Sequence, residues 1–209
     1  MSKAYNPDKK NETTRSLRLP SEALADIQNA VETMRKGGVI LYPTDTIWGL
    51  GCDATNAEAV NRIYAIKQRS DSKALIVLVD SEVKVQFYVK EVPDVAWDII
   101  EMSNKPTTII YDGARNLAEN LLANDGSVGM RVTGEVFSKQ LCSRFQKAIV
   151  STSANISGQP APHNFQEISD DILSQVDYIV KYRQDDTTSL PASTIIKLGA
   201  HNDVKIIRQ

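Results

Sequence analysis

Residues 74–79 read ALIVLV, an unbroken apolar run that lies between Lys73 and Asp80. A strand with one exposed face alternates apolar and polar residues, whereas a strand covered on both faces is apolar throughout. The run therefore predicts a strand covered on both faces, which is typical of a sheet packed between helices.

Helical and strand patterns interleave on both sides of this run. Apolar residues at helical spacing predict helices over 21–35, 57–66, 83–89, 95–102, 136–145 and 165–175. Short apolar runs predict strands over 39–42, 107–111, 128–132, 148–150, 177–181, 194–198 and 204–207, and residues 43–51 are predicted as a loop. The interleaving indicates an α/β fold, with the strand order left open.

Length and composition favour one globular domain. The chain has 209 residues, of which 42% are hydrophobic, and a formal net charge of −2. Residues 1–16 are polar and are predicted to be a flexible tail, so residues 17–209 form the expected single domain. The net charge argues against a surface coated with positive charge for nucleic acid, although a local cationic pocket stays open.

The expected location of the protein in the cell follows from the absence of disulfide, membrane-spanning and signal-peptide patterns in the sequence. The two cysteines, Cys52 and Cys142, do not make a disulfide framework, and the two histidines do not make a zinc site. No apolar run reaches the roughly 20 residues that span a bilayer, and the polar N-terminus has no signal-peptide core. We therefore expect a soluble, cytoplasmic protein.

Polar side chains collect where the predicted strands end, and in open α/β sheets these places commonly bind ligands. The stretch 42–51, YPTDTIWGLG, places Thr44 and Thr46 on either side of Asp45. The stretch 151–158, STSANISG, carries four hydroxyls and one amide directly after a predicted strand. The stretch 190–194, LPAST, leads into another strand. Each of them also fits an ordinary turn.

Cations form a further cluster. Lys67, Arg69 and Lys73 lie between the helix over 57–66 and the apolar run. They fit either a favourable helix C-terminus followed by a solvated loop or a site for phosphate or carboxylate. The chain lacks GxxxxGK[ST], which excludes a P-loop. The remaining charges, at Arg115, Arg144, Arg183, Asp185 and Asp186, are expected on the solvated surface.

Taken together, these clusters supply hydroxyls, one amide and several cationic groups, with few groups that could shuttle protons. This inventory suits an anionic ligand that also carries hydroxyl or amine groups, such as a nucleotide or an amino acid. A nucleophilic serine is disfavoured because the chain lacks a Gly-x-Ser-x-Gly elbow.

Three motifs, YPTDTIWGLGCDA at 42–54, Lys67-x-Arg69 and Ser153-Ala154-Asn155, resemble the YrdC/TsaC family in its short, single-domain form. The resemblance implies a twisted mixed sheet flanked by helices around a deep, positively charged cavity. It also implies a nucleotidyltransferase that makes threonylcarbamoyl-AMP and pyrophosphate from ATP, L-threonine and bicarbonate. That product serves the threonylcarbamoyl modification of adenosine 37 in tRNA.

The resemblance assigns roles by position. Lys67 and Arg69 are the expected catalytic residues and hold the ATP phosphates. The other expected nucleotide contacts are Lys73, Ser127, Asn155, His163 and Arg208. The expected threonine contacts are Thr46, Arg131, Ser153 and Ser193. Mg²⁺ is expected to travel with the ATP phosphates and to need no protein metal site.

Two stretches depart from the family pattern. Ser70 replaces a proline after Lys-x-Arg, and NKPTT at 104–108, a loop expected to line the cavity, lacks the glycine of a Pro-Gly-Pro segment. A YciO-like protein that binds nucleotide or RNA without turnover is therefore the alternative. The expected partners are a separate tRNA threonylcarbamoyl transferase that receives the product and, more weakly, tRNA itself.

Overall fold

The computed structural model describes residues 19–68, 75–199 and 203–208. The predicted flexible tail, residues 1–16, lies outside the described residues, as do Arg69 and Lys73. Within the described part no helix is both long enough and apolar enough to cross a membrane.

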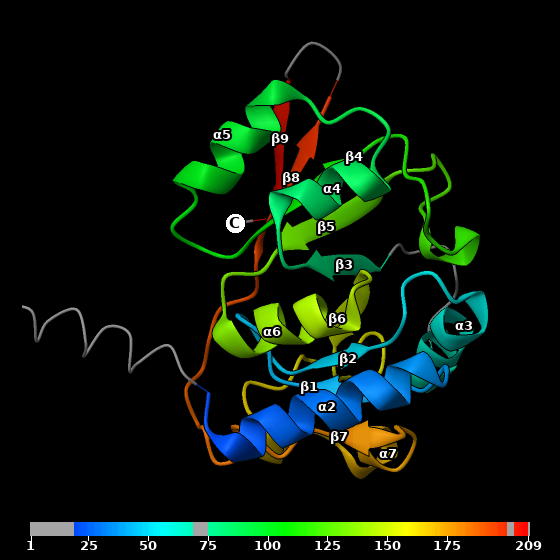
Figure 1. The fold of residues 1–209 in the computed structure, drawn as a ribbon, viewed down its shortest axis with the longest axis vertical. Coiled ribbons are helices and arrows are strands. Elements are labelled where there is room, and N and C mark those ends of the chain that lie inside the picture. The colour runs from blue at the N-terminus through cyan, green and yellow to red at the C-terminus, as the bar shows by residue number, and fades with distance from the viewer. Residues whose placement is uncertain (1–18, 69–74, 200–202, 209) are drawn as a thin grey trace, which may run out of the picture.

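One mixed sheet of nine strands organises the described residues (Figure 1), in the order β7-β1-β2-β6-β3-β5-β4-β8-β9. The pairs β1–β7, β3–β5 and β4–β8 are parallel, and the other neighbours are antiparallel. The strands are β1 Ile40–Tyr42, β2 Gly49–Gly51, β3 Ile76–Val79, β4 Thr107–Tyr111, β5 Val128–Val132, β6 Ile149–Ser153, β7 Tyr178–Ile179, β8 Thr194–Leu198 and β9 Val204–Arg208. The sheet confirms the α/β expectation.

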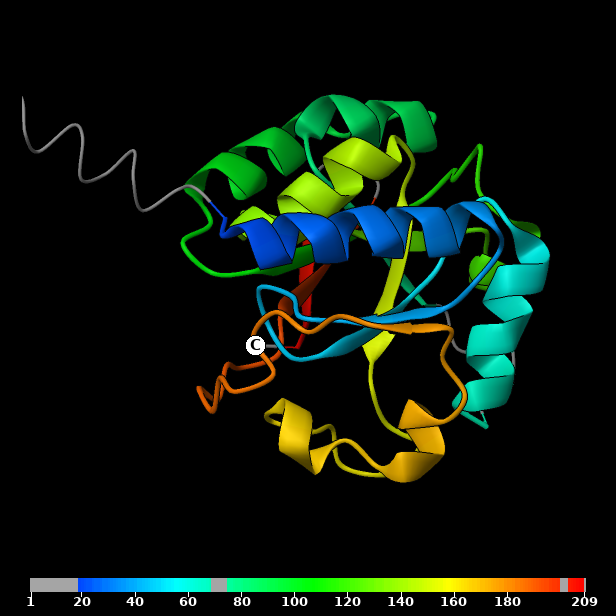
Figure 2. The same ribbon diagram turned by 60° about the horizontal axis from the view of Figure 1, so that its bottom comes forward.

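Helices cover the sheet unevenly. They are α2 Ser21–Arg35, α3 Ala57–Ile66, α4 Glu82–Tyr88, α5 Asp94–Met102, α6 Val136–Phe145 and α7 Asp170–Leu173, with 3-10 turns η1 Glu119–Leu121 and η2 Phe165–Glu167. Figure 2 shows α2, α4, α5 and α6 together above the sheet, and η2 and α7 below it. Consistent with the apolar run that predicted it, β3 has Val77, Leu78 and Val79 fully buried.

Many boundaries match the sequence patterns. Helices α2, α3 and α6 and strands β4, β5 and β8 begin and end at the predicted residues. Helices α3 and α6 also have side-chain caps at their N-termini. The N-cap of α3, for example, is Asn56, whose side chain accepts hydrogen bonds from Glu58 and Ala59.

The prediction that residues 43–51 form a loop was wrong at its end, because Gly49–Gly51 is strand β2. Glycine disfavours strands by itself, but close packing requires it here. A Cβ on Gly51 would lie 2.7 Å from the Tyr42 ring and 3.1 Å from the Val150 carbonyl oxygen. Pairing with two neighbouring strands therefore overrides the local preference.

Two further predictions were corrected by tertiary contacts. The strand predicted over 148–150 extends through Ser153, because Ser153 pairs with Gly49 and Thr152 with Leu50. The single helix predicted over 165–175 is broken into η2 and α7, because Ile168 is extended, with φ −73° and ψ 126°, and is buried. Burial of Ile168 thus decides where the helical pattern stops.

A buried carboxylate connects α2 to the chain around β7. Asp26 is 4% exposed. Its oxygens accept a hydrogen bond from the Tyr178 hydroxyl at 2.6 Å and from the main-chain amides of Lys181 and Tyr182 at 2.9 and 2.8 Å. Helix α2 is thereby joined to the edge strand β7, some 150 residues later in the chain.

We predict that Asp26→Ala lowers the free energy of unfolding by about 3 kcal/mol, since it leaves buried donors without an acceptor. Urea denaturation measures the change. Gln28→Ala, at an exposed position of the same helix, is the control and should change stability by less than about 0.5 kcal/mol. Equal stability of the two variants would contradict the role of Asp26.

Candidate functional site

A cavity of about 280 Å³ lies among the ends of several strands. Four predicted threonine contacts (Thr46, Arg131, Ser153 and Ser193) and Arg208 line it. The other described lining residues are Thr44, Ile47, Trp48, Gly49, Leu75, Ile76, Ser151, Thr152, Ala161, Ala192 and Ile195. The structure therefore brings together residues from the polar stretches 42–51, 151–158 and 190–194.

Strand pairing explains why these distant residues meet. The pairing of Gly49 with Ser153 lays the 44–49 turn beside the end of β6. The parallel pairing of Thr107 with Thr194 places Ser193 at the start of β8, and Ile195 pairs with Arg208. The neighbouring strand β5 carries Arg131.

The turn between β1 and β2 is held by its own hydroxyls. The Thr44 hydroxyl donates to the Ile47 carbonyl at 2.8 Å and accepts from the Thr46 amide at 3.0 Å. The hydroxyls of Thr44 and Thr46 lie 3.0 Å apart. This network fixes two hydroxyls at the cavity wall.

Arg131 is the most buried cation of the cavity. Its side chain is 2% exposed, and its Nη2 lies 2.8 Å from Asp45 Oδ1 and 3.4 Å from Thr46 Oγ1. Its Nε is buried without a hydrogen-bond partner. Burial raises the pKa of Asp45, and the positive charge of Arg131 opposes that rise.

A second guanidinium reaches the same cavity. Nε and Nη2 of Arg208 donate to the Ser193 carbonyl at 3.0 and 2.9 Å, and the Ser193 hydroxyl lies 3.0 Å from that of Thr108. Burial and, to a smaller extent, the charge of Arg131 lower the pKa of Arg208. An anion between Arg131 and Arg208 offsets the repulsion between their two positive charges.

Lys67 lies behind the cavity wall. It is 2% exposed, and its Nζ donates to the carbonyls of Ser153 at 2.5 Å and Asn155 at 2.8 Å, and to Asn155 Oδ1 at 3.3 Å. The ammonium therefore ties the end of α3 to the Ser153-Ala154-Asn155 segment. Its contact with ATP phosphates stays a prediction, as do the roles of Arg69 and Lys73, which lie outside the described residues.

Two other predicted nucleotide contacts lie apart from this cavity. Ser127 precedes β5, at the opposite end from Arg131, and its hydroxyl donates to Asp125 at 2.6 Å. His163 lines a small adjoining hollow with Thr44 and Trp48, and its Nδ1 lies 3.1 Å from the Ser189 hydroxyl. Their roles also stay predictions.

Sequence reasoning missed two groups beside the site. Arg183, expected on the solvated surface, donates to the Thr44 carbonyl at 3.2 Å and pairs with Asp186 at 2.9 Å. Asp45 was noted only as an acid between two threonines, yet it is the ion-pair partner of Arg131. No local pattern signals the contact of Arg183 with Thr44 or that of Asp45 with Arg131, because the two residues of each contact lie more than 80 positions apart.

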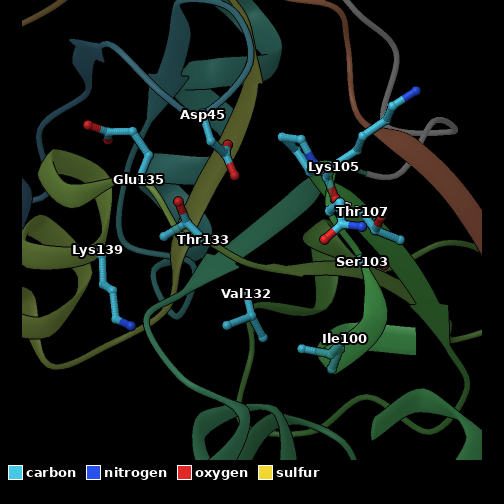
Figure 3. Close-up of a pocket in the computed structure, with 12 residues that line it drawn as sticks. Asp45, Ile100, Ser103, Lys105, Thr107, Val132, Thr133, Glu135 and Lys139 are labelled. Atoms are coloured by element: carbon cyan, nitrogen blue, oxygen red, sulfur yellow. Dashed lines mark hydrogen bonds between the residues drawn. The ribbon is translucent and has the colours of Figure 1, made fainter. Parts of the chain in front are cut away.

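Asp45 lines a second cavity, of about 380 Å³ (Figure 3). Its wall includes residues 103–107, so four of the five residues in the altered loop at 104–108 line this cavity rather than the first one. Val132, Thr133, Glu135 and Lys139 contribute the facing wall. No group of three or more His, Cys, Asp or Glu side chains among the described residues is placed to hold a metal ion.

Comparisons with known proteins find relatives over most of the chain. The family model Sua5_yciO_yrdC, described as "Telomere recombination", matches residues 32–209. The threonylcarbamoyl-AMP synthase of Pseudoalteromonas translucida is 37% identical over 157 residues, which cover 74% of this chain and 84% of that protein.

Two solved structures share the fold. YciO of E. coli superimposes with a TM-score of 0.76 at 27% identity, over 91% of each chain. Sua5 of P. abyssi superimposes with a TM-score of 0.78 at 25% identity, over 87% of this chain and 55% of that one. The chain thus spans about half the length of Sua5, which has also been solved in complex with L-threonine.

We predict that Lys67→Met loosens the segment 153–157, because three acceptors of that segment lose their cationic donor. Hydrogen exchange of the amides of Asn155 and Ser157 should accelerate at least tenfold. Lys36→Met, at the exposed lysine that follows α2, is the control and should leave these amides unchanged. Unaltered protection in Lys67→Met would show that the segment does not depend on this lysine.

Proposed function

The chain belongs to the Sua5/YciO/YrdC family, and on that premise we propose that it is a threonylcarbamoyl-AMP synthase. This nucleotidyltransferase forms threonylcarbamoyl-AMP and pyrophosphate from ATP, L-threonine and bicarbonate. Support comes from relatives named threonylcarbamoyl-AMP synthase that are 37% and 36% identical to this chain.

The cavity itself is the observation that carries the proposal. Five separate segments, at 44–46, 131, 151–153, 193 and 208, contribute two guanidinium groups and a set of hydroxyls to one hollow of about 280 Å³. Guanidinium groups bind carboxylates and phosphates through paired hydrogen bonds. Hydroxyls donate and accept, so they suit the hydroxyl and amine of threonine.

In the proposed reaction the threonine nitrogen first takes up carbon dioxide derived from bicarbonate, which gives N-carboxy-threonine. An oxygen of the new carboxylate then attacks the α-phosphorus of ATP. The bond from that phosphorus to the bridging oxygen breaks, and pyrophosphate leaves with the electron pair. The substrates supply both nucleophile and leaving group, so the protein has to align them and offset their charge.

The charge to be offset is substantial. Two unit anions 4 Å apart repel by about 4 kcal/mol at an effective dielectric near 20. This repulsion alone would slow the reaction by about a thousandfold, since each 1.36 kcal/mol is tenfold in rate. We assign the compensation to Arg131 on the threonine carboxylate, to Arg208 on the nucleotide, and to Lys67 and Arg69 on the phosphates.

The remaining contacts complete the proposal. Thr46, Ser153 and Ser193 orient threonine, while Lys73, Ser127, Asn155 and His163 contact the nucleotide. Mg²⁺ arrives with ATP, held mainly by phosphate oxygens and water. A separate transferase then passes the group to tRNA. Weak tRNA contact and a cytoplasmic location also belong to this proposal.

The YciO-like alternative of binding without turnover is less well supported. E. coli YciO matches at 27% identity, below the 37% of the P. translucida synthase. Binding of ATP without pyrophosphate release would be its signature.

We predict that the purified chain releases pyrophosphate from ATP and Mg²⁺ only when threonine and bicarbonate are both present. Mass spectrometry should detect threonylcarbamoyl-AMP in the same mixture. Arg69→Ala should lower the rate at least tenfold, because one phosphate-binding cation is lost.

Valine and serine replace threonine as substrate controls, and Arg35→Ala, at the exposed end of α2, is the control variant. Equal rates with and without threonine would refute the synthase proposal. Full activity of Arg69→Ala would refute only the role of that residue.

A second prediction concerns the division of the pocket. Ser153→Ala should weaken threonine binding at least fivefold and ATP binding by less than twofold, because its hydroxyl is assigned to threonine. Isothermal titration calorimetry measures both affinities, with Ser174→Ala, an exposed serine beyond α7, as the control. A larger loss for ATP would reverse the assignment.

A further inference from the structure

The ion pair between Asp45 and Arg131 joins one residue from each of the two cavities. Arg131 lines the 280 Å³ cavity, whereas Asp45 lines the 380 Å³ cavity, where its carboxylate points toward the interior (Figure 3). Their side chains are 2% and 11% exposed, and the pair spans 2.8 Å. A ligand carboxylate on Arg131 would therefore lie next to an acid at the border of the second cavity.

Arg131 has donor capacity left for such a ligand. Asp45 and Thr46 engage Nη2, while Nε is buried without a hydrogen-bond partner. A buried guanidinium donor without an acceptor is costly, and an incoming carboxylate satisfies it. Binding can thus proceed while Asp45 keeps its place beside Nη2.

The pair complements a free amino acid. At neutral pH the amino acid carries a carboxylate and an ammonium separated by one carbon, so its site needs a cation beside an anion. The described residues that line the first cavity include no carboxylate and no imidazole. Asp45 pairs with Arg131, a cation of this cavity, whereas Asp186, in the small adjoining hollow, pairs with Arg183.

The amine must lose a proton before it can react. An ammonium has no lone pair, so the first step of the proposed synthase reaction requires a base at the nitrogen. We propose, on the basis of that function, that Asp45 is the catalytic base that deprotonates the α-ammonium of the amino acid held by Arg131.

The bonds balance as follows. An N–H bond of the ammonium breaks, and its proton moves to a carboxylate oxygen of Asp45. The freed lone pair forms the N–C bond to carbon dioxide derived from bicarbonate, and one C=O electron pair moves onto oxygen. The nitrogen then loses its second proton to water, and Asp45 returns its own proton to water through the second cavity.

The surroundings of Asp45 suit a base. Burial raises its pKa, the negative charge of Glu135 adds to the rise, and the positive charge of Arg131 opposes it. Lys105 and Lys139 line the same cavity. The Glu135 carboxylate caps helix α6, because it accepts hydrogen bonds from the amides of Phe137 and Ser138 at 2.9 and 2.7 Å. A raised pKa brings the Asp45 carboxyl closer to the pKa of the substrate ammonium, which makes proton transfer between them less unfavourable.

The test compares Asp45→Asn with the wild-type protein by threonine-dependent pyrophosphate release between pH 6.5 and 9.5. We expect kcat to fall at least 100-fold at pH 7.5, since the amide cannot accept the proton. The deficit should shrink at least tenfold by pH 9.5, where more of the threonine is already unprotonated. Asp45→Glu, which keeps a carboxylate, should recover at least tenfold over Asp45→Asn.

A purely positional role predicts a different outcome. If Asp45 only orients Arg131, the deficit of Asp45→Asn would be the same at every pH, and that result would overturn the proposal. Activity of Asp45→Asn within threefold of wild type at pH 7.5 would also overturn it. Asp98→Asn, at an exposed carboxylate on α5, is the control and should follow the wild-type profile.

Two further measurements distinguish a folding defect from loss of the base, and failure of the proposed function from failure of this inference. If Asp45→Asn does not fold, as judged by thermal melting, Asp45→Ala with added formate replaces it. Formate should restore its activity at least tenfold, and absence of rescue would count against the base. Wild-type protein that makes no threonylcarbamoyl-AMP refutes the proposed function itself, whereas an active wild type with an active Asp45→Asn refutes only this inference.

Discussion

The antiparallel pairing of β2 with β6 is the constraint on which the site depends. It is possible because Gly49 and Gly51 have no Cβ, which lets the Tyr42 ring and the backbone of β6 approach closely. This pairing sets the 44–49 turn beside Ser153. Two stretches that are 100 residues apart thereby form one wall of the cavity.

A second constraint is the set of buried charged side chains beside that wall of the cavity. Arg131 is almost fully buried and is compensated in part by Asp45. Arg208 reaches the same hollow from the last described strand, and burial together with the charge of Arg131 disfavours its own charge. Two guanidinium groups beside one carboxylate favour a ligand that carries both a negative and a positive group, as an amino acid does.

Lys67 shows how one residue can serve the site without lining it. Its ammonium holds the carbonyls of Ser153 and Asn155, so the hydroxyl and amide side chains of that segment depend on it for their position. The proposed contact with ATP phosphates requires this ammonium to exchange main-chain acceptors for phosphate oxygens. The two roles make different predictions for hydrogen exchange and for catalysis.

The sequence by itself determined the α/β class, both ends of α2, α3, α6, β4, β5 and β8, and the hydroxyls and cations of the site. Those features follow from local periods, caps and turn residues, which act over a few positions. Only the tertiary structure decided that Gly49–Gly51 is a strand, that the helical pattern breaks at Ile168, and that Asp45 pairs with Arg131. These outcomes depend on strand pairing and burial between distant segments, and such contacts leave no local pattern in the chain.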